Sequence, residues 1–478
     1  MIKKLLFDEP NPVLLKQQLE DNPYLLTKIN GLGFKKVDNL ALKLKPEFIN
    51  STERLVAFIK YYFTDLGDSK GHTWCSVKIL KSAISNNVPE CVDKVDWLLE
   101  NNEFLHIEDD KVGLKYYYDI EMQIYNLLLE KSKKQTDINI SDEKIEQAIK
   151  HAEEEQGFEY VIEQLDTIKK SLHRTISLIT GKAGTGKTSI MRAIVKAYTE
   201  NQFTLTASAL SAMAAQRITE ATSFPAMTIH RTLGCMGLNE FSFNKDNHMI
   251  TSVAFLDEGS MVNASLFLHW LEAIDDNTRI IISGDHKQLP PIGFGNVFSD
   301  LIEMFDDSVV SKLVKPMRQA EKSGILVDAN LIRENINPIT EKLQPRIIHG
   351  ELQDMYYMFR NNRQSLFDIA VKTFLKSVDS DGIDNVVIAV PRRKDCLNST
   401  NELNKVIQEK LLGDVLQSIS GFENEFKLGA KVMQTVNDYD KNVFNGEIGY
   451  ITEISERYEG KKKEEYCVVT YTDIFGKR

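Results

Sequence analysis

The stretch ISLITGKAGTGKTS, residues 176–189, decides the fold. Its apolar start, Ile176 to Ile179, predicts a short buried strand, and the residues that follow the stretch predict a helix. Between strand and helix the sequence fits the spacing G-x-x-x-x-G-K-T, from Gly181 to Thr188. Strand, glycine-rich loop and helix in this order predict a loop that binds phosphates through its backbone N–H groups and the helix N-terminus.

The loop predicts the chemistry of a bound nucleoside triphosphate with a divalent cation. Lys187 is expected to neutralise the β and γ phosphates of ATP, and the hydroxyl of Thr188 to ligate Mg²⁺. The residues expected to contact the nucleotide follow one another along the loop; they are Gly181, Ala183, Gly184, Thr185, Gly186, Lys187, Thr188 and Ser189.

Two later strand ends carry polar residues that complete such a site. The apolar run 253–256 predicts a strand that ends at Asp257 and Glu258. Asp257 is expected to hold Mg²⁺, usually through water, and Glu258 to orient or deprotonate the attacking water. A second buried run, 280–283, leads into GDHKQLPP, where Gln288 is placed to sense the γ-phosphate or the attacking water.

Length and composition are those of a soluble protein with several domains. The 478 residues suggest about three domains, and 42% hydrophobic with 27% charged residues is ordinary for a globular chain. The sequence contains no apolar run of about 18 residues, so a membrane span is not expected. The net charge of −11 argues only weakly against nucleic acid, because binding depends on where positive charge lies. The five cysteines form no C-x-x-C pair and are expected to be reduced, in the cytoplasm.

The pattern of apolar residues changes along the chain. Residues 22–44 predict a helix-hairpin-helix unit around its glycines, and residues 72–118 predict a winged-helix-like module. Each module binds DNA or serves as scaffold, and the sequence leaves both open. A polar linker is expected at 131–146. From about residue 155 strands alternate with helices, which favours parallel sheets, and 386–390 is a further candidate for a buried strand.

Four segments taken together resemble the superfamily 1B helicases of the RecD-like type. They are GKAGTGKT at 181–188, DEGSM at 257–261, GDHKQLPPIG at 284–293 and PMRQA at 316–320. The resemblance continues in VMQ at 432–434 and VFNGEIG at 443–449. INGLGFKKVDNLA and GHTW near the start resemble the N-terminal extension of the stand-alone enzymes, so the resemblance spans nearly the whole chain.

The resemblance implies an α/β fold with two RecA-like P-loop NTPase domains, each with a parallel sheet, after a mainly helical N-terminal domain. The expected boundaries are 1–135 for the N-terminal domain, 136–312 and 313–445 for the two motor domains, and 446–478 for the start of an SH3-like insert. A small hairpin is expected near 234–251, where Phe241 or Phe243 either stacks on a DNA base or packs inside the domain.

The resemblance also implies an activity and its residues. The activity is movement on single-stranded DNA in the 5′→3′ direction, driven by ATP with Mg²⁺, with unwinding of the duplex ahead. Arg318 is implied as an arginine finger that reaches the ATP across the cleft. Gln164 is implied to contact adenine, with Gln156 as the nearby alternative. DNA contacts are implied for Ser211, His230, Arg392 and Asn445.

The sequence departs from the family pattern after residue 449. In the family an SH3-like insert there is followed by a threonine-histidine-lysine motif and a last arginine-bearing motif, and neither is found here. The chain is therefore expected to be cut short inside its second motor domain. Because one arginine that stabilises phosphoryl transfer is worth about 10³–10⁵ in rate, weak hydrolysis is expected until a C-terminal segment is supplied.

Two other classes of protein fit part of the pattern. One is a nucleotide-binding, DNA-binding module that does not unwind DNA. The other is the helicase part of a larger recombination or conjugation complex. The expected partners are single-stranded DNA and its junctions with duplex, with a C-terminal fragment or replication and repair proteins in addition, and no membrane.

Overall fold

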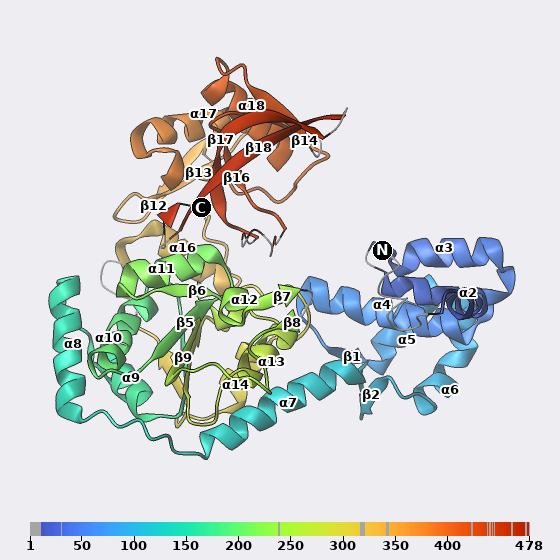
Figure 1. The fold of residues 1–478 in the computed structure, drawn as a ribbon, viewed down its shortest axis with the longest axis horizontal. Helices are drawn as coiled ribbons and strands as arrows, with labels where there is room; N and C mark the ends of the chain where they lie inside the picture. Colours follow the sequence, from blue (N-terminus) through green and yellow to red (C-terminus); the bar gives the residue numbers. More distant parts are fainter. Residues whose placement is uncertain are drawn as a thin grey trace.

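The computed structural model arranges the chain in three parts (Figure 1). A mainly helical N-terminal part lies to one side of a central sheet, and a C-terminal part lies above that sheet. The structure describes residues 11–29, 31–237, 240–315, 321–340, 344–421, 424–436, 438, 441, 443, 445–459, 462–473 and 476–477.

The N-terminal part consists of short helices around a core of its own. Its helices are α2 (Pro12–Asp21), η1 (Pro23–Lys28), α3 (Phe34–Leu44), η2 (Pro46–Asn50), α4 (Thr52–Lys70), α5 (Val77–Asn87), η3 (Pro89–Lys94) and α6 (Val95–Glu100). Proline at the start of four of these helices suits a position whose N–H has no partner in the helix. Three antiparallel strands follow the order β1-β3-β2, with bounds β1 (Trp74–Ser76), β2 (Leu105–Glu108) and β3 (Lys111–Leu114). The strand pair predicted for the winged-helix-like module is therefore present.

Helix α7 (Lys115–Ser132) joins the N-terminal part to the central sheet. Its residues Ile120, Ile124 and Leu128 are four apart, so they share one face, and that face is buried in the central core. The linker predicted at 131–146 is shorter in the structure. Helix α7 continues to Ser132, and α8 (Asp142–Gln156) already begins at Asp142, so only residues 133–141 connect the two helices. This stretch is polar on average, yet Ile138 and Ile140 are buried in the core that α8 and α10 (Lys187–Glu200) share.

Six parallel strands form the central sheet, in the order β11-β4-β10-β9-β5-β6. Their bounds are β4 (Ile176–Gly181), β5 (Leu205–Ala209), β6 (Ala226–Thr228), β9 (Val253–Asp257), β10 (Arg279–Gly284) and β11 (Val310–Leu313). The predicted α/β class with a parallel sheet is confirmed. The order places β10 between β4 and β9, so the three strand ends that the sequence singles out are neighbours at one edge.

Helices cover both faces of this sheet. Ile280 and Ile282 pack into the core on one face and Ile281 into the core on the other, as the alternation of side chains along a strand requires. The first face is covered by α7, α12 (Ile229–Thr232), α13 (Ala264–Glu272) and α14 (Val297–Met304). The second face is covered by α8, α9 (Ile162–His173), α10 (Lys187–Glu200) and α11 (Ala212–Thr222).

The hairpin predicted near 234–251 is formed by β7 (Cys235–Gly237) and β8 (Glu240–Phe241). Phe241 is only 7% exposed and its ring lies 5.1 Å from the ring of His269 on α13. Phe243 is partly buried against the same core. Phe241 therefore packs inside the domain, and Phe243 packs against the same core with part of its surface exposed.

The C-terminal part pairs its strands antiparallel. Its strands are β12 (Arg346–His349), β13 (Met355–Met358), β14 (Ser418–Gly421), β15 (Asn424–Lys427), β16 (Lys431–Met433), β17 (Ile448–Glu459), β18 (Lys462–Asp473) and β19 (Gly476–Lys477). Its helices, with one that precedes β12, are α16 (Gly324–Arg333), α17 (Arg363–Asp381), η5 (Ile383–Asn385) and α18 (Thr400–Leu412).

The strand predicted at 386–390 is not a strand in the structure. Ile388 and Val390 pack against α17 and α18, but Val387 is 85% exposed. Within the described residues no strand pairs with this segment, and an extended segment becomes a strand only through hydrogen-bonded neighbours. A second parallel sheet, which the resemblance implies for 313–445, is likewise not among the described strand pairings.

Candidate nucleotide and DNA site

The phosphate loop connects β4 to α10 as its sequence predicts. Gly184 and Gly186 adopt positive φ angles of 79° and 86°, which glycine accepts without strain. Helix α10 begins at Lys187, so the free N–H groups of its first turn point into the loop. Gly181 is packed so tightly that an added Cβ would lie 2.6 Å from the hydroxyl of Thr185. The loop is therefore a preformed site for an anion.

Lys187 and Thr188 lie where the phosphate loop meets α10. The ammonium of Lys187 donates to the carbonyl oxygens of Gly181, at 2.6 Å, and Lys182, at 3.4 Å, and so lies across the mouth of the loop. Thr188 is exposed at the first turn of α10. Mg²⁺ prefers oxygen ligands and is commonly bound beside phosphates. Thr188, in the first turn of α10, and Asp257, at the end of β9, are the residues that would hold this ion. Bound ATP·Mg²⁺ would supply the phosphoryl group and the charge that the site neutralises.

Side chains behind the loop hold its shape. Gln164 is 2% exposed, donates to the carbonyl of Thr185 at 3.1 Å and accepts from the N–H of Val161 at 3.2 Å. These contacts make Gln164 a brace of the loop, and its implied contact with adenine stays a prediction. Ser189 donates to Gln156 at 2.7 Å. Tyr160, which the sequence analysis does not single out, donates to the carbonyl of Ser189 at 2.8 Å.

Asp257 and Glu258 form the acidic side of the site. Asp257 ends β9 and accepts a hydrogen bond from the hydroxyl of Ser283 on the neighbouring β10. Burial raises the pKa of Asp257, and the nearby charge of Lys187 opposes this rise. Glu258 adopts φ 52°, a left-handed conformation that is uncommon outside glycine. Such strain occurs where the position of a side chain matters for function.

Glu258 has the properties of a general base. Its Oε2 atom is buried and makes no hydrogen bond within the described part of the chain. Burial raises the pKa of Glu258, and the charge of Asp257 adds to the rise, whereas Lys187 opposes it. A buried carboxylate with a raised pKa and a free oxygen accepts a proton from water more readily than an exposed one.

The segment after β10 is the third side of the site. Asp285 is 2% exposed and accepts a hydrogen bond of 2.6 Å from Arg333 at the end of α16. Gln288 is exposed two residues after His286, whose ring is hydrogen-bonded to Thr180 at 2.7 Å. The backbone N–H of Gln288 donates to the carbonyl of Asp285, so a tight turn presents its side chain outward.

The C-terminal end of helix α16 lies at the phosphate loop. Glu334, next to Arg333, lies 3.7 Å from Lys182 in the loop and 3.4 Å from Lys287. The sequence does not predict a role for Arg333 or Glu334, because a single arginine or glutamate at a helix end is not part of any recognisable motif. Arg318, the implied arginine finger, lies outside the described residues.

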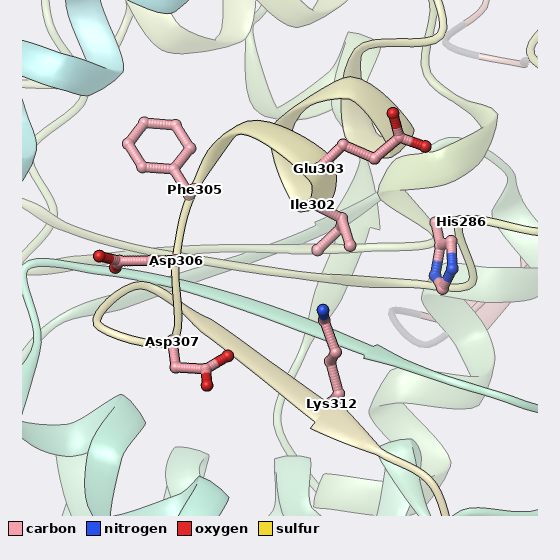
Figure 2. A pocket seen from close by; sticks show the side chains of 7 residues that line it. All are labelled: His286, Ile302, Glu303, Phe305, Asp306, Asp307 and Lys312. Carbon is pink, nitrogen blue, oxygen red and sulfur yellow. The ribbon is translucent and has the colours of Figure 1, made fainter.

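A hollow of about 460 Å³ lies beside β11 (Figure 2). It is lined by His286, Ile302, Glu303, Phe305, Asp306, Asp307 and Lys312. None of these residues belongs to the phosphate loop or to the acidic pair after β9, and the lining mixes three carboxylates with one lysine. The hollow therefore borders the site only through His286, the residue that is hydrogen-bonded to Thr180.

Two of the four implied DNA contacts follow adjacent strands. Ser211 comes two residues after β5 and His230 two residues after β6, and Ala209 pairs with Thr228 where the two strands end. Ser211 is exposed and caps α11 through a bond from the N–H of Ala214. His230 is partly buried, and burial lowers its pKa.

The other two implied contacts lie in the C-terminal part. Arg392 is exposed in the irregular segment before α18. Asn445 is exposed two residues before Glu447, and Glu447 lies 3.9 Å from Arg231, the neighbour of His230. This ion pair brings the segments of Asn445 and His230 together across two parts of the molecule. Within the part of the chain that the structure describes, the carbonyl of Arg392 accepts from the N–H of Thr400 at 3.0 Å, a contact inside its own segment.

These features define a P-loop NTPase whose site is completed by a segment beyond the central sheet. The chain matches three families: residues 159–352 match "AAA domain", residues 403–471 match "ATP-dependent RecD-like DNA helicase SH3 domain", and residues 14–74 match "ATP-dependent RecD2 DNA helicase HHH domain". The resemblance is confirmed: the chain carries an AAA domain together with domains of the ATP-dependent RecD-like DNA helicases.

Individual relatives are distant. The RecBCD enzyme subunit RecD of Buchnera aphidicola is 24% identical over 463 residues, which cover 80% of this chain and 75% of the relative. The ATP-dependent RecD2 DNA helicase of Deinococcus radiodurans is 27% identical over 294 residues, which cover 60% of this chain and 38% of the relative. The crystal structure of the Pif1 helicase from Candida albicans aligns with a TM-score of 0.33 at 17% identity, over 66% of this chain and 76% of that one.

Among the described residues, none of the helices has the length and apolar character needed to span a membrane.

Proposed function

We propose that this chain is a motor that moves 5′→3′ along single-stranded DNA and opens the duplex ahead of it, using ATP and Mg²⁺. The observation that carries the proposal is the meeting of Lys187, Glu258 and the Asp285 turn at the ends of three neighbouring strands. Lys187 would hold the phosphates and Glu258 would activate the water. Gln288 would sense the γ-phosphate from the turn.

The contacts of α16 support movement as well as hydrolysis. Arg333 and Glu334 hold α16 to the turn and to the phosphate loop, so a change of nucleotide changes what this helix can contact. A motor needs such a link, because a ligand shifts a conformation only through contacts that differ between its states. Arg318 would complete the site as the arginine finger.

DNA would lie over the ends of β5 and β6, against Ser211 and His230. The pair between Arg231 and Glu447 places Asn445 near the same edge. We assign Arg392 a phosphate contact, which its exposure permits. The substrates would be single strands and their junctions with duplex, which such an enzyme would meet in the cytoplasm.

Strand polarity tests the proposal. A duplex with a 5′ single-stranded tail and one with a 3′ tail are mixed with the protein, ATP and Mg²⁺, and strand release is measured. Release from the 5′-tailed duplex alone is expected, and a Lys187→Ala variant should release neither. Release from the 3′-tailed duplex alone would contradict the direction. No release, with nucleotide binding intact, would favour a DNA-binding module that uses nucleotide as a switch.

A second candidate is the motor of a larger assembly, which is favoured by relatives that are named subunits of the RecBCD enzyme. Purification of tagged chain from its native cells distinguishes a stand-alone motor from a subunit.

A further inference from the structure

The loop that carries Gln288, residues 285–296, is held at both ends by other parts of the chain. At its start Asp285 accepts the hydrogen bond from Arg333. At its end the N–H of Gly295 donates to the carbonyl of Gly71, in the N-terminal part, at 3.0 Å. Between these anchors Leu289 and Ile292 are 82% and 87% exposed. The exposed middle, with Gln288, therefore depends on its two ends for its position.

Phe294 is the side chain that fixes the second end. Its ring is stacked on the ring of Tyr117 in α7, with the centroids 3.9 Å apart and the planes 15° apart. A Cβ at Gly67 of α4 would lie 3.0 Å from the Cβ of Phe294, so the missing side chain at Gly67 lets the phenylalanine approach that helix. Phe294 packs against both the core of the N-terminal part and the core of the central domain.

The backbone around Phe294 is bound to the segment that follows Glu258. The carbonyl of Phe294 accepts from the N–H of Ala264 at 3.0 Å, and the carbonyl of Ile292 accepts from the side chain of Asn263 at 3.0 Å. Asn263 caps α13, which begins six residues after Glu258. Phe294 thus contacts the N-terminal part with its ring and the segment after Glu258 with its backbone carbonyl.

We propose that Phe294 is a positioning residue for ATP hydrolysis, and that the N-terminal part sets the hydrolysis rate by holding Phe294 between α7 and α4. This inference rests on the proposed function. Truncation of Phe294 removes the ring packing at the end of the loop and leaves only its backbone hydrogen bonds, so Gln288 is held less firmly at its distance from the phosphates. Lys187 and the phosphate loop lie outside these contacts, so nucleotide binding is unaffected.

The test compares Phe294→Ala with Phe294→Tyr in the full chain. Displacement of a reacting group by about 1 Å costs up to about 10²-fold, so Phe294→Ala should lower the DNA-stimulated kcat about 10- to 100-fold. The affinity for a fluorescent ATP analogue should stay that of the wild type, which a general loss of structure would not allow. Phe294→Tyr keeps the stacked ring and should restore kcat.

Two further variants separate positioning from folding. Phe104→Ala removes an aromatic ring of the same N-terminal core that lies beneath the ammonium of Lys60, and kcat should stay that of the wild type. Gly67→Ala places a Cβ 3.0 Å from the Cβ of Phe294 and so displaces this side chain from α4; it should lower kcat and leave the affinity for the ATP analogue unchanged.

A wild-type kcat in Phe294→Ala, or an equal loss in Phe104→Ala, overturns the role of Phe294. A wild-type protein without DNA-stimulated hydrolysis contradicts the proposed function itself, and with it this inference. The two failures are therefore told apart by the wild-type measurement.

Discussion

In the central sheet, residues 176–313, parallel strands are buried on both faces, whereas the C-terminal part pairs its strands antiparallel around a small core. The central cores contain Phe255 at 1% exposure and Trp270 at 0%. The core between α17 and α18 contains Phe367, Val371 and Leu403, at 7%, 4% and 4% exposure. The difference shows where the chain's rigidity lies: the phosphate loop and the acidic pair are mounted on the central sheet, and the C-terminal part meets them through polar contacts.

The largest expected effect follows from the central sheet's own chemistry. Glu258→Gln keeps the shape of the side chain but removes the base, so DNA-stimulated hydrolysis should fall by about 10²–10⁴-fold. Nucleotide binding should persist, because the phosphate loop is untouched. Steady-state ATPase and equilibrium binding of a fluorescent analogue measure the two effects, with Glu154→Gln, a change at an exposed residue of α8, as the matched control. Equal loss in both variants would remove Glu258 from its assigned role.

Stability measurements sharpen the comparison between the two regions. Phe255→Ala leaves a cavity between sheet and helices, and the free energy of unfolding of the central domain should fall by about 3–5 kcal/mol. Phe367→Ala should cost less, because a small core collapses around the gap more easily. Chemical denaturation, followed by hydrogen exchange in each region, measures both. Equal costs would show that the C-terminal part is packed as firmly as the central sheet.

The contact between the two regions has a measurable strength. Arg333 and Asp285 are 10% and 3% exposed as side chains and lie 2.6 Å apart. Loss of either partner leaves a buried charge unpaired, which costs about 2–5 kcal/mol. A double-mutant cycle of Arg333→Ala with Asp285→Ala should therefore show coupling in the free energy of unfolding. Additive costs in the cycle would mean that α16 is not held to the Gln288 loop by this pair.

The smallest expected effect is a pH dependence where α7 meets the N-terminal part. Burial raises the pKa of Glu121 to about 7. A hydrogen bond with Thr73 lowers this pKa, and the negative charge of Asp300 raises it further. The folded state therefore keeps a proton that the unfolded state releases, and stability falls as pH rises from about 4.5 through 7.

The side chain in Glu121→Gln is neutral at every pH. The variant should therefore raise the thermal midpoint of unfolding at pH 8 by a few degrees at most and leave the midpoint at pH 4 unchanged. About 1 kcal/mol of stability moves such a midpoint by roughly 2–4 °C. Scanning calorimetry at the two pH values measures this difference. The same rise at both pH values would mean that the proton on Glu121 is not the cause.

Much of the site can be predicted from the sequence because each motif is local. Lys187 and Glu258 each follow a run of apolar residues that only a buried strand explains. The brace by Gln164 and the contacts of Arg333 and Phe294 cannot be predicted in this way. They depend on which strand lies beside which, and on how the N-terminal part and α16 meet the sheet.

The strand predicted at 386–390 also shows that a local pattern does not determine which elements pair. Its apolar residues resemble those of β10, yet β10 has neighbours on both edges, and none of the described strands pairs with 386–390. Composition predicts the tendency to extend, whereas pairing decides whether an extended segment becomes a strand. The predicted division of the chain at 312 falls one residue before the end of β11 and stays a prediction as a domain boundary.

The most direct test of the account is a crystal structure of the chain with Mg²⁺, ADP and aluminium fluoride, which mimics the transferred phosphoryl group. The account predicts Lys187 on the phosphates, Thr188 and Asp257 around the metal, Glu258 on the attacking water, and Gln288 and Arg318 facing the fluoride. A complex in which Glu258 and Gln288 point away from the fluoride, with α16 still held by Arg333, would contradict it.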